Sequence, residues 1–190
     1  MAVLETSLTP AEYLAQEHLA EFKSEYIDGE VREMAGAPIE HDRIVRSLLR
    51  SLDTSTESRG CETFTSDVRV QMAHRRFTYP DLTIVCGEPT FAPADIDTLA
   101  NPTVVFEVLS HSTESYDLGD KARMYRQVDS LQGFVLVAQD RPWVEVWTRE
   151  SSDSWRVREF TGLEASAELP ALSIILTLRE IYHRIDFTDS

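Results

Sequence analysis

The chain has 190 residues, of which 42% are hydrophobic and 27% are charged. This composition is typical of a packed globular protein and argues against intrinsic disorder. Its longest apolar run, residues 134–138, is far shorter than the about 20 residues of a membrane-spanning helix. Because no repeat or Gly/Ser linker divides the sequence, we expect one domain over residues 1–190 and no contact with a membrane.

The net charge of the chain disfavours binding to nucleic acid. The chain has 18 Lys and Arg against 33 Asp and Glu, which gives a formal net charge of −15. Such a charge repels nucleic acid at long range, and non-specific DNA binding depends largely on neutralising phosphates. Strong non-specific binding is therefore not expected, whereas a local basic surface or a metal site stays open.

The cysteines and the first residues predict the cellular setting. Cys61 and Cys86 are too few for a disulfide framework or a four-thiolate zinc site. Residues 1–10 have neither the basic start nor the long apolar stretch of a secretory signal. We therefore expect a cytoplasmic protein with reduced thiols.

Four elements are predicted within the first 52 residues of the chain. Residues 9–12 (TPAE) combine a capping threonine, an early proline and a glutamate three residues after the cap, so a helix is expected to about residue 17. Two short strands are expected within residues 23–34, around the tight-turn pair Asp28-Gly29. Apolar residues at helical spacing predict a helix over residues 41–52.

The predicted helix over residues 41–52 has a basic outer face. Arg43, Arg46 and Arg50 gather opposite its apolar face. This face is either simply solvated or contacts phosphates.

Strands and helices then alternate along the rest of the chain. We expect strands over residues 62–72, 77–86, 103–109, 133–138, 143–148 and 155–160, a surface loop over 87–102, and helices over 117–128 and 178–185. This order predicts an α/β or α+β fold with a central mixed β-sheet flanked by helices.

Glu107 stands out because it interrupts an otherwise apolar strand over residues 103–109. Both faces of such a strand are expected to be buried. A lone buried carboxylate is costly or has a strongly shifted pKa. Glu107 is therefore either held by a buried hydrogen bond or ion pair, or it acts as a metal ligand or general base.

Lys121 and Asp81 are the other two unusual residues. Lys121 lies within the apolar face of the helix predicted over 117–128, so its ammonium either extends to water or reaches back to the Glu107 strand. Asp81 follows Pro80 at the start of a strand, where an acidic residue is usually solvated.

Taken together, these three residues form a pattern with a known chemistry. Two carboxylates, often with a backbone carbonyl, hold Mg²⁺ through oxygen ligands. The metal lowers the pKa of a bound water and stabilises charge on a phosphate, and a nearby lysine stabilises the transition state. The pattern is that of phosphodiester hydrolysis.

The chain resembles the PD-(D/E)XK nuclease superfamily and, more narrowly, its bacterial Uma2 branch of restriction-endonuclease-like proteins. The resemblance covers nearly the whole chain. It rests on the segments SEYIDGEVREMAGAPIEH (24–41), FTSDVRV (64–70), TYPDLTIVCGEP (78–89), VVFEVLSHSTESYDLGDKARMYRQ (104–127), QDRPWVEVW (139–147) and LREIY (178–182).

The resemblance implies a restriction-endonuclease-like core and DNA cleavage that depends on Mg²⁺ or Mn²⁺. Asp81 would be the aspartate of the PD motif and Glu107 the acid of the second half-motif, with the Val108 carbonyl as a third metal ligand. Leu109 stands where the motif has lysine, and Lys121 in the DLGDK segment matches a lysine that has migrated to the next helix.

Two further residues match the family's pattern. Glu25 corresponds to a carboxylate of the first motif and would bind the metal or support the site. His41 corresponds to a histidine at the start of the first long helix. A purely structural hydrogen bond is the alternative for each.

The sequence thus leads to one main hypothesis and two alternatives. The main hypothesis is a Mg²⁺-dependent endonuclease that hydrolyses DNA phosphodiester bonds, working as a homodimer because double-strand cleavage needs two active sites. The net charge of −15 favours instead a catalytically silent module that binds nucleic acid or another protein. In the third possibility, Glu107 and Lys121 form a structural ion pair, and neither metal nor DNA binds.

Overall fold

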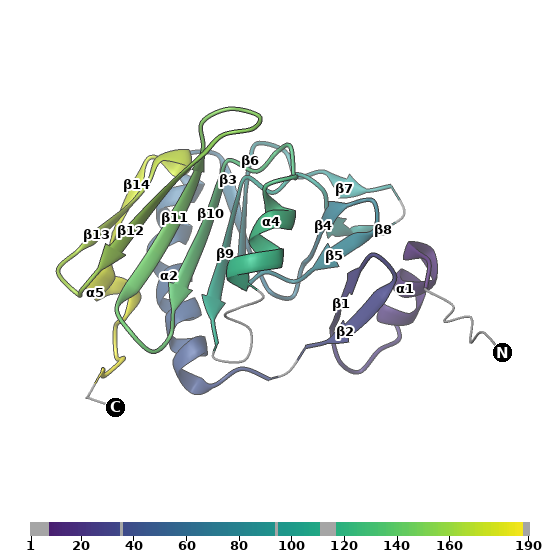
Figure 1. The fold of residues 1–190 in the computed structure, drawn as a ribbon, viewed down its shortest axis with the longest axis horizontal. Helices are drawn as coiled ribbons and strands as arrows, with labels where there is room; N and C mark the ends of the chain where they lie inside the picture. Colours follow the sequence, from purple (N-terminus) through teal and green to yellow (C-terminus); the bar gives the residue numbers. More distant parts are fainter. Residues whose placement is uncertain (1–7, 35, 94, 111–116, 188–190) are drawn as a thin grey trace.

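Two six-stranded β-sheets form the framework of the protein (Figure 1). The structure is a computed structural model and describes residues 8–34, 36–93, 95–110 and 117–187. The first sheet, here called the N-terminal sheet, has the strand order β2-β1-β5-β4-β8-β7. Its strands are β1 (Ser24–Ile27), β2 (Glu30–Glu33), β4 (Arg69–Ala73), β5 (Arg76–Thr78), β7 (Phe91–Ala92) and β8 (Asp95–Leu99).

The second sheet, here called the central sheet, has the order β12-β11-β10-β9-β6-β3. Its strands are β3 (Cys61–Thr65), β6 (Leu82–Cys86), β9 (Val104–Leu109), β10 (Gly133–Ala138), β11 (Trp143–Arg149) and β12 (Trp155–Thr161). Strand β9 runs parallel to β10 and antiparallel to β6. The prediction of a mixed-sheet α+β fold is confirmed, although the strands divide between two sheets.

The helical segments are short apart from α2. They are α1 (Pro10–Glu17), α2 (Ile39–Glu57), the π-helical turn η1 (Asp117–Lys121), α4 (Ala122–Tyr125), the 3₁₀ turn η2 (Pro170–Leu172) and α5 (Leu178–Ile181). A small hairpin of β13 (Ser166–Leu169) and β14 (Ile174–Thr177) precedes α5. The helices expected over 117–128 and 178–185 are thus present but shorter.

The start of α1 and the first hairpin follow the local sequence signals. Thr9 and Glu12 form the expected capping box. The turn between β1 and β2 has positive φ at both Asp28 and Gly29, as a tight hairpin turn requires. Both predictions are confirmed because they depend on neighbouring residues alone.

Two of the passages of the chain between the sheets interrupt strands that the sequence predicts as continuous. The predicted strand over 62–72 divides into β3 and β4, and the one over 77–86 divides into β5 and β6. Each half pairs in a different sheet. Pro80 lies at the second of these two points. Proline has no backbone N–H, and no hydrogen bond between strands requires one here. Asp81 is the next residue.

The segment 87–102 is not the loop that its prolines predict. It contains β7 and β8, and β8 pairs in parallel with β4. The prediction was wrong because this pairing joins segments far apart in the sequence, which local turn residues do not reveal.

Strand β9 lies between two layers of apolar side chains, as its composition predicts. Phe106 and Val108 belong to the cluster formed with α2, whereas Val105 and Leu109 belong to the cluster formed with α4. Because successive strand residues face opposite sides, Glu107 points toward the α4 side. The strand therefore presents one carboxylate to the segment that carries Lys121.

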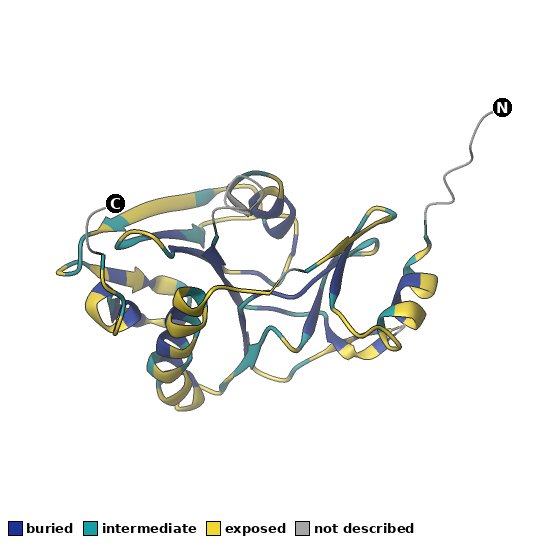
Figure 2. Cartoon of the chain, turned by 90° about the horizontal axis from the view of Figure 1, so that it is seen from below, coloured by how far each residue is buried: buried dark blue, intermediate teal, exposed yellow. Residues whose placement is uncertain are grey.

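Helix α2 covers the other side of the central sheet. Its apolar face buries Ile44, Leu48 and Leu52 completely, and its outer face is exposed (Figure 2). The three arginines predicted for that outer face, Arg43, Arg46 and Arg50, are all exposed. The helix is longer than predicted because it begins directly after Pro38.

Cys61 and Cys86 form a disulfide. The register of β3 against β6 places the two residues directly opposite each other. The expectation of two reduced thiols is therefore wrong for this structure, because strand pairing brings together residues that the sequence separates by 25 positions.

Among the helices in the described ranges, none is both long and apolar enough to cross a membrane.

Candidate active site

Asp81 is fixed at the point where the chain enters the central sheet. Its Oδ2 accepts a hydrogen bond from the backbone N–H of Val108, with an oxygen-to-nitrogen distance of 2.7 Å. The Nε2 of His41, at the start of α2, lies 3.2 Å from the same oxygen. The side chain of Asp81 stays 16% exposed, so this carboxylate is both anchored and accessible to solvent.

Glu107 meets Lys121 across the α4 side of the central sheet. The Lys121 Nζ lies 2.9 Å from Glu107 Oε1. The hydroxyl of Tyr125 donates a hydrogen bond of 2.7 Å to the same oxygen. Glu107 and Lys121 are each only 5% exposed, which confirms that Lys121 turns back toward the β9 strand rather than outward to water.

Glu25 brings a second carboxylate to the same lysine from the other sheet. The Lys121 Nζ lies 3.0 Å from Glu25 Oε1. The hydroxyl of Thr78, on β5, also donates to this oxygen. Lys121 therefore bridges β1 of the N-terminal sheet and β9 of the central sheet. We call Glu25, Asp81, Glu107 and Lys121 the acid–lysine site.

The buried part of the site combines opposite charges with two hydroxyl groups. Two carboxylates face one ammonium, and a hydroxyl donor assists each carboxylate. Burial, together with the charge of Glu107, raises the pKa of Tyr125 well above its usual value. Tyr125 therefore remains a protonated hydrogen-bond donor throughout the physiological pH range.

The structure brings the predicted residues together from five separate segments. Glu25 and Glu107 share Lys121, Asp81 adjoins β9 through Val108, and His41 contacts Asp81. The roles proposed for them in metal binding and catalysis stay predictions.

Sequence reasoning missed the two hydroxyl donors of the site. Tyr125 lies four residues after Lys121, a spacing that places two side chains on one helical face, so its proximity was open to prediction. Thr78 approaches Glu25 only through the pairing of β1 with β5, for which the sequence holds no signal.

The donor set fits a hard divalent cation such as Mg²⁺ or Mn²⁺, which prefers oxygen ligands. Asp81 and Glu107 offer carboxylate oxygens at the adjoining ends of β6 and β9. In an extended strand the N–H and C=O of one residue point to the same side, so the Val108 carbonyl also faces Asp81. No group of three acidic, His or Cys ligands among the described residues includes Asp81 or Glu107. A backbone carbonyl and water would therefore have to complete the coordination.

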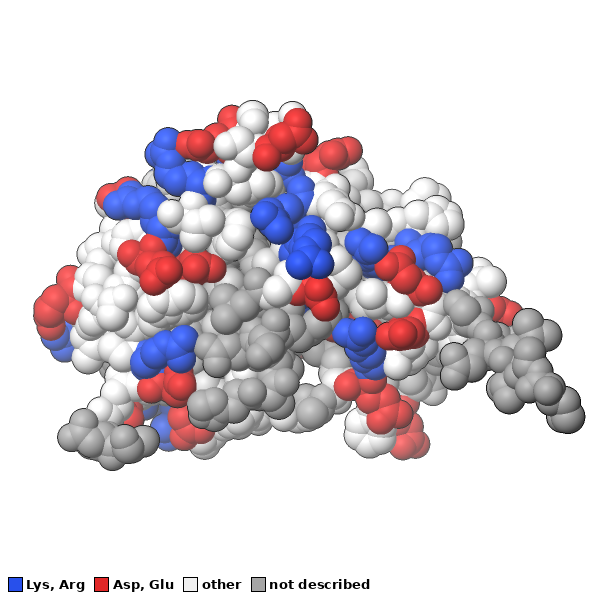
Figure 3. Space-filling view, in the orientation of Figure 1, with Lys and Arg blue, Asp and Glu red and all other residues white. Residues whose placement is uncertain are grey.

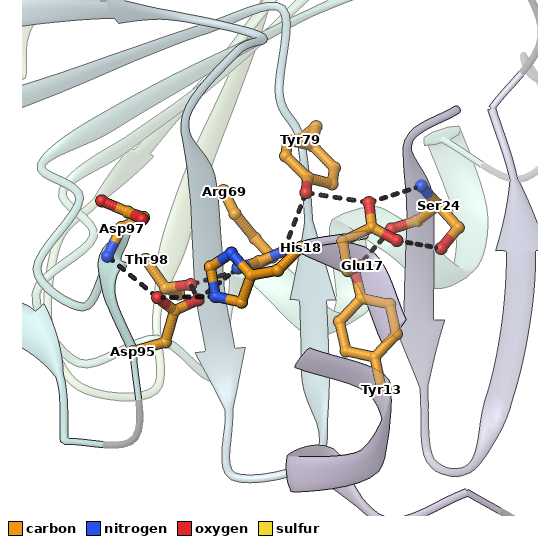
Figure 4. Close-up of polar contacts among 9 residues, drawn as sticks. All are labelled: Tyr13, Glu17, His18, Ser24, Arg69, Tyr79, Asp95, Asp97 and Thr98. Atoms are coloured by element: carbon orange, nitrogen blue, oxygen red, sulfur yellow. Dashed lines mark hydrogen bonds and ion pairs between the residues drawn. The ribbon is translucent and has the colours of Figure 1, made fainter. Parts of the chain in front are cut away.

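A second polar cluster, drawn in Figure 4, lies at the end of α1. His18, Asp95 and Asp97 have ligand atoms within 4.8 Å of one another. However, Asp95 already pairs with the buried guanidinium of Arg69. Arg69 also donates to Tyr79, whose hydroxyl in turn bonds Glu17 of α1. The cluster therefore ties α1 to the N-terminal sheet, and none of its residues belongs to the acid–lysine site.

Comparison with known sequences agrees with this geometry. Residues 10–179 match the family Uma2, which is described as "Putative restriction endonuclease". The chain belongs to the Uma2 family. The match includes every residue of the acid–lysine site and His41, and it places this Uma2 protein in the restriction-endonuclease-like PD-(D/E)XK superfamily.

Two relatives from Synechocystis sp. (strain ATCC 27184 / PCC 6803 / Kazusa) match most of this Uma2 protein. The uncharacterized protein sll1609 is 34% identical over 168 residues, which cover 88% of this chain and 95% of the relative. The uncharacterized protein slr1290 is 28% identical over 181 residues, covering 95% and 94%. The similarity thus extends over nearly the full length of each relative.

A solved structure has the same fold. It is described as a putative nuclease belonging to DUF820 from Anabaena variabilis ATCC 29413. The TM-score is 0.76 with 18% sequence identity, over 92% of this chain and 97% of the other. At this identity the likeness establishes the nuclease-like fold alone.

Proposed function

We propose that this Uma2 protein is a Mg²⁺- or Mn²⁺-dependent endonuclease that hydrolyses phosphodiester bonds of DNA. One observation carries the proposal: a buried lysine lies 2.9 Å from a buried glutamate on the strand beside which Asp81 is docked. A stable fold gains little from burying such charges, because their desolvation offsets their attraction. Buried, coupled acids and bases of this kind cluster at functional sites.

Asp81, Glu107 and the Val108 carbonyl would hold the metal ion. When bound, the ion lowers the pKa of a coordinated water and stabilises negative charge on the phosphate. His41 and the Val108 N–H hold one oxygen of Asp81 in place. Tyr125 does the same for Oε1 of Glu107. These contacts orient both carboxylates before any ligand arrives.

Lys121 supplies a positive charge beside the reacting phosphate. Its ammonium lies between two carboxylates. A cation at this point stabilises the negative charge that develops on the phosphate as water adds to phosphorus and the bond to the leaving oxygen breaks. Glu25 positions the ammonium from the opposite sheet.

A plasmid-nicking assay with purified protein tests this function. Wild type is incubated with supercoiled DNA in Mg²⁺, in Mn²⁺ and in EDTA, beside the variant Glu107→Gln. We expect nicking or linearisation that requires the metal and is abolished by the substitution. Equal cleavage by Glu107→Gln would show that the mechanism is wrong.

Titration calorimetry of Mg²⁺ and Mn²⁺ tests the metal site separately. Binding should disappear in the Asp81→Ala/Glu107→Ala double variant. The titration is repeated with DNA present, because a phosphate oxygen can complete the coordination sphere. Absence of both metal and DNA binding would favour a protein-interaction module on the same fold.

We also propose that the protein acts as a homodimer. One chain carries one acid–lysine site, and cutting both strands of a duplex needs two. Two-fold pairing is the commonest assembly of identical chains. Light scattering coupled to gel filtration would show a mass of about twice the 21.6 kDa chain.

A further inference from the structure

A cleft lined by arginines opens beside the acid–lysine site. It has a volume of about 220 Å³ and lies between the first hairpin, β5 and α4. Arg32, Arg76 and Arg123 each contribute a side chain to its lining. The other lining residues are Ile27, Asp28, Asp120, Met124 and Gln127. We call it the arginine cleft.

The strand register places the cleft on the same face of the sheet as Glu25. Arg32 lies directly opposite Glu25 on the neighbouring strand, and Arg76 lies directly opposite Ile27. Residues that face each other across a pair of strands project to the same side. The side of the sheet on which Glu25 contacts Lys121 therefore also carries Arg32 and Arg76, two residues of the arginine cleft.

The helical side of the cleft starts directly after the catalytic lysine. Asp120 and Arg123 flank Lys121 in the sequence, and Met124 and Gln127 follow on the next turn. The residues on this side of the cleft therefore lie on the same segment as Lys121.

The charge of the cleft differs in sign from that of the protein. Its lining holds three arginines and two aspartates, which gives a formal charge of +1 (3 − 2), whereas the whole chain has −15. Basic and acidic side chains alternate over α4 and the adjoining strands on the face shown in Figure 3. This part of the surface is thus a local basic region on a strongly acidic protein.

Two of the arginines, Arg76 and Arg123, pair with aspartates that are themselves exposed. Arg76 is held by Asp28 at 2.7 Å and by the Gln127 side chain at 3.1 Å, and it remains 25% exposed. Arg123 pairs at 3.4 Å with an aspartate that is 71% exposed. The Arg123–Asp120 pair is solvated on both sides, and such a pair is worth only about 0–1 kcal/mol, so a phosphate can displace its carboxylate at little cost.

We infer that the arginine cleft, which shares its helical segment with Lys121, binds the backbone phosphates of the DNA strand whose scissile phosphate lies at the acid–lysine site. This inference rests on the proposed function. The guanidinium fork matches the geometry of phosphate oxygens and binds them in pairs. Three such groups on one path fix the position of the strand relative to Lys121, and they overcome locally the repulsion caused by the net charge.

DNA binding across a salt series tests the inference. Fluorescence anisotropy of a labelled duplex is measured with and without Mg²⁺ for wild type and for Arg32→Gln/Arg76→Gln/Arg123→Gln. Each phosphate contact contributes about 0.9 to the slope of log affinity against log salt. We expect the triple variant to lose at least about tenfold in affinity at low salt and to have a slope smaller by about 2–3.

The chain offers a matched control for the loss of three positive charges. Arg156, Arg158 and Arg179 are all exposed, and each pairs with a surface glutamate far along the chain from the cleft. Their triple Gln variant should bind DNA like wild type. Replacing the cleft arginines by lysine should retain most of the salt slope, which separates lost charge from a folding defect.

The outcomes distinguish the cleft from the proposed function. If the cleft variant bound DNA with wild-type affinity and salt slope and still cut it, the proposed role of the cleft would be wrong. The proposed nuclease function would then stand. An equal loss in the control variant would also overturn it, because net charge alone would explain binding. No DNA binding by wild type under any condition would overturn both the cleft and the nuclease.

Discussion

Lys121 and Glu25 form an ion pair that joins the two sheets of the protein. The Lys121 Nζ lies 3.0 Å from Glu25 Oε1, although Glu25 belongs to the N-terminal sheet and Lys121 follows the core strand of the central sheet. The same ammonium contacts Glu107 at 2.9 Å. The site is therefore assembled at the junction between the sheets, and its charges depend on both.

Replacing Lys121 by methionine should destabilise the protein strongly. The substitution keeps the apolar stem but removes the ammonium that contacts the buried carboxylates of Glu25 and Glu107. Breaking a buried pair in this way costs about 3–5 kcal/mol. Urea denaturation at neutral pH measures the change in unfolding free energy.

Lys23→Met is the matched control, because Lys23 pairs with Asp67 at the surface. It should cost less than about 1 kcal/mol. If the two substitutions lowered the unfolding free energy equally, the buried ion pairs of Lys121 would contribute no more than a surface ion pair.

Asparagine and alanine at position 81 should separate the structural role of Asp81 from its proposed catalytic role. Asp81→Asn retains an acceptor for the Val108 N–H, so we expect the unfolding free energy to change by less than about 1 kcal/mol. Metal-dependent DNA cleavage should nevertheless be lost, because the negative charge is gone. Asp81→Ala should cost about 1–3 kcal/mol, since it leaves a buried donor unsatisfied. Cleavage at the wild-type rate by Asp81→Asn would exclude this carboxylate as a metal ligand.

Removing the Tyr125 hydroxyl should lower the stability of the protein, because Glu107 loses a hydrogen-bond donor. Tyr125→Phe keeps the ring packed against Phe134, whose centroid is 4.9 Å away, and deletes only the donor to Glu107. A hydrogen bond to a charged group contributes about 1.5–3 kcal/mol, so thermal and urea unfolding should both shift by that order. Thr78→Val makes the corresponding change at Glu25, and we expect a similar loss. No shift in either variant would mean that the two hydroxyls do not stabilise these carboxylates.

Reducing the disulfide should lower stability through the unfolded state. The bond between Cys61 and Cys86 spans 25 residues, and closing a loop of this size stabilises a protein by about 3 kcal/mol in the chain-entropy account. Urea unfolding with and without a reductant measures the difference, and thiol titration of the denatured protein confirms the redox state. Cys61→Ser should reproduce the reduced protein and show no response to the reductant. Two titratable thiols in the untreated protein would contradict the disulfide.

Asp95 should stabilise the protein at neutral pH, and this contribution should be lost in acid. Burial opposes its ionisation, but the Asp97 N–H, the Thr98 hydroxyl and Arg69 together hold its pKa below the usual value. A carboxyl whose pKa is lowered by folding stabilises the protein above its unfolded pKa of about 3.9, and this contribution is lost as the pH falls through the folded pKa.

Asp95→Asn tests this assignment through the pH dependence of unfolding. The variant should be less stable than wild type at neutral pH, and the difference should shrink as the pH falls below about 4. A difference in unfolding free energy that is constant from pH 7 to pH 3 would show that Asp95 does not titrate in this way.

The sequence by itself determined the elements whose causes are local. The capping box at Thr9 and the turn at Asp28-Gly29 depend on residues within one turn of each other. The apolar run around Glu107 predicts a doubly buried strand, whereas the apolar face around Lys121 leaves open whether its ammonium extends to water or reaches back to that strand. Hydrophobic periodicity and local hydrogen bonding are sufficient for these predictions.

Only the tertiary structure decided which segments pair and therefore what surrounds each charge. The division of two predicted strands between two sheets, the strand β8 in a proline-rich segment and the pairing of Cys61 with Cys86 all result from contacts between distant parts of the chain. The same holds for Glu25, which meets Lys121 because β1 packs beside β5 and not because of any neighbour in sequence. Strand pairing is non-local, and its energy lies in packing and cross-strand contacts that a single sequence does not display.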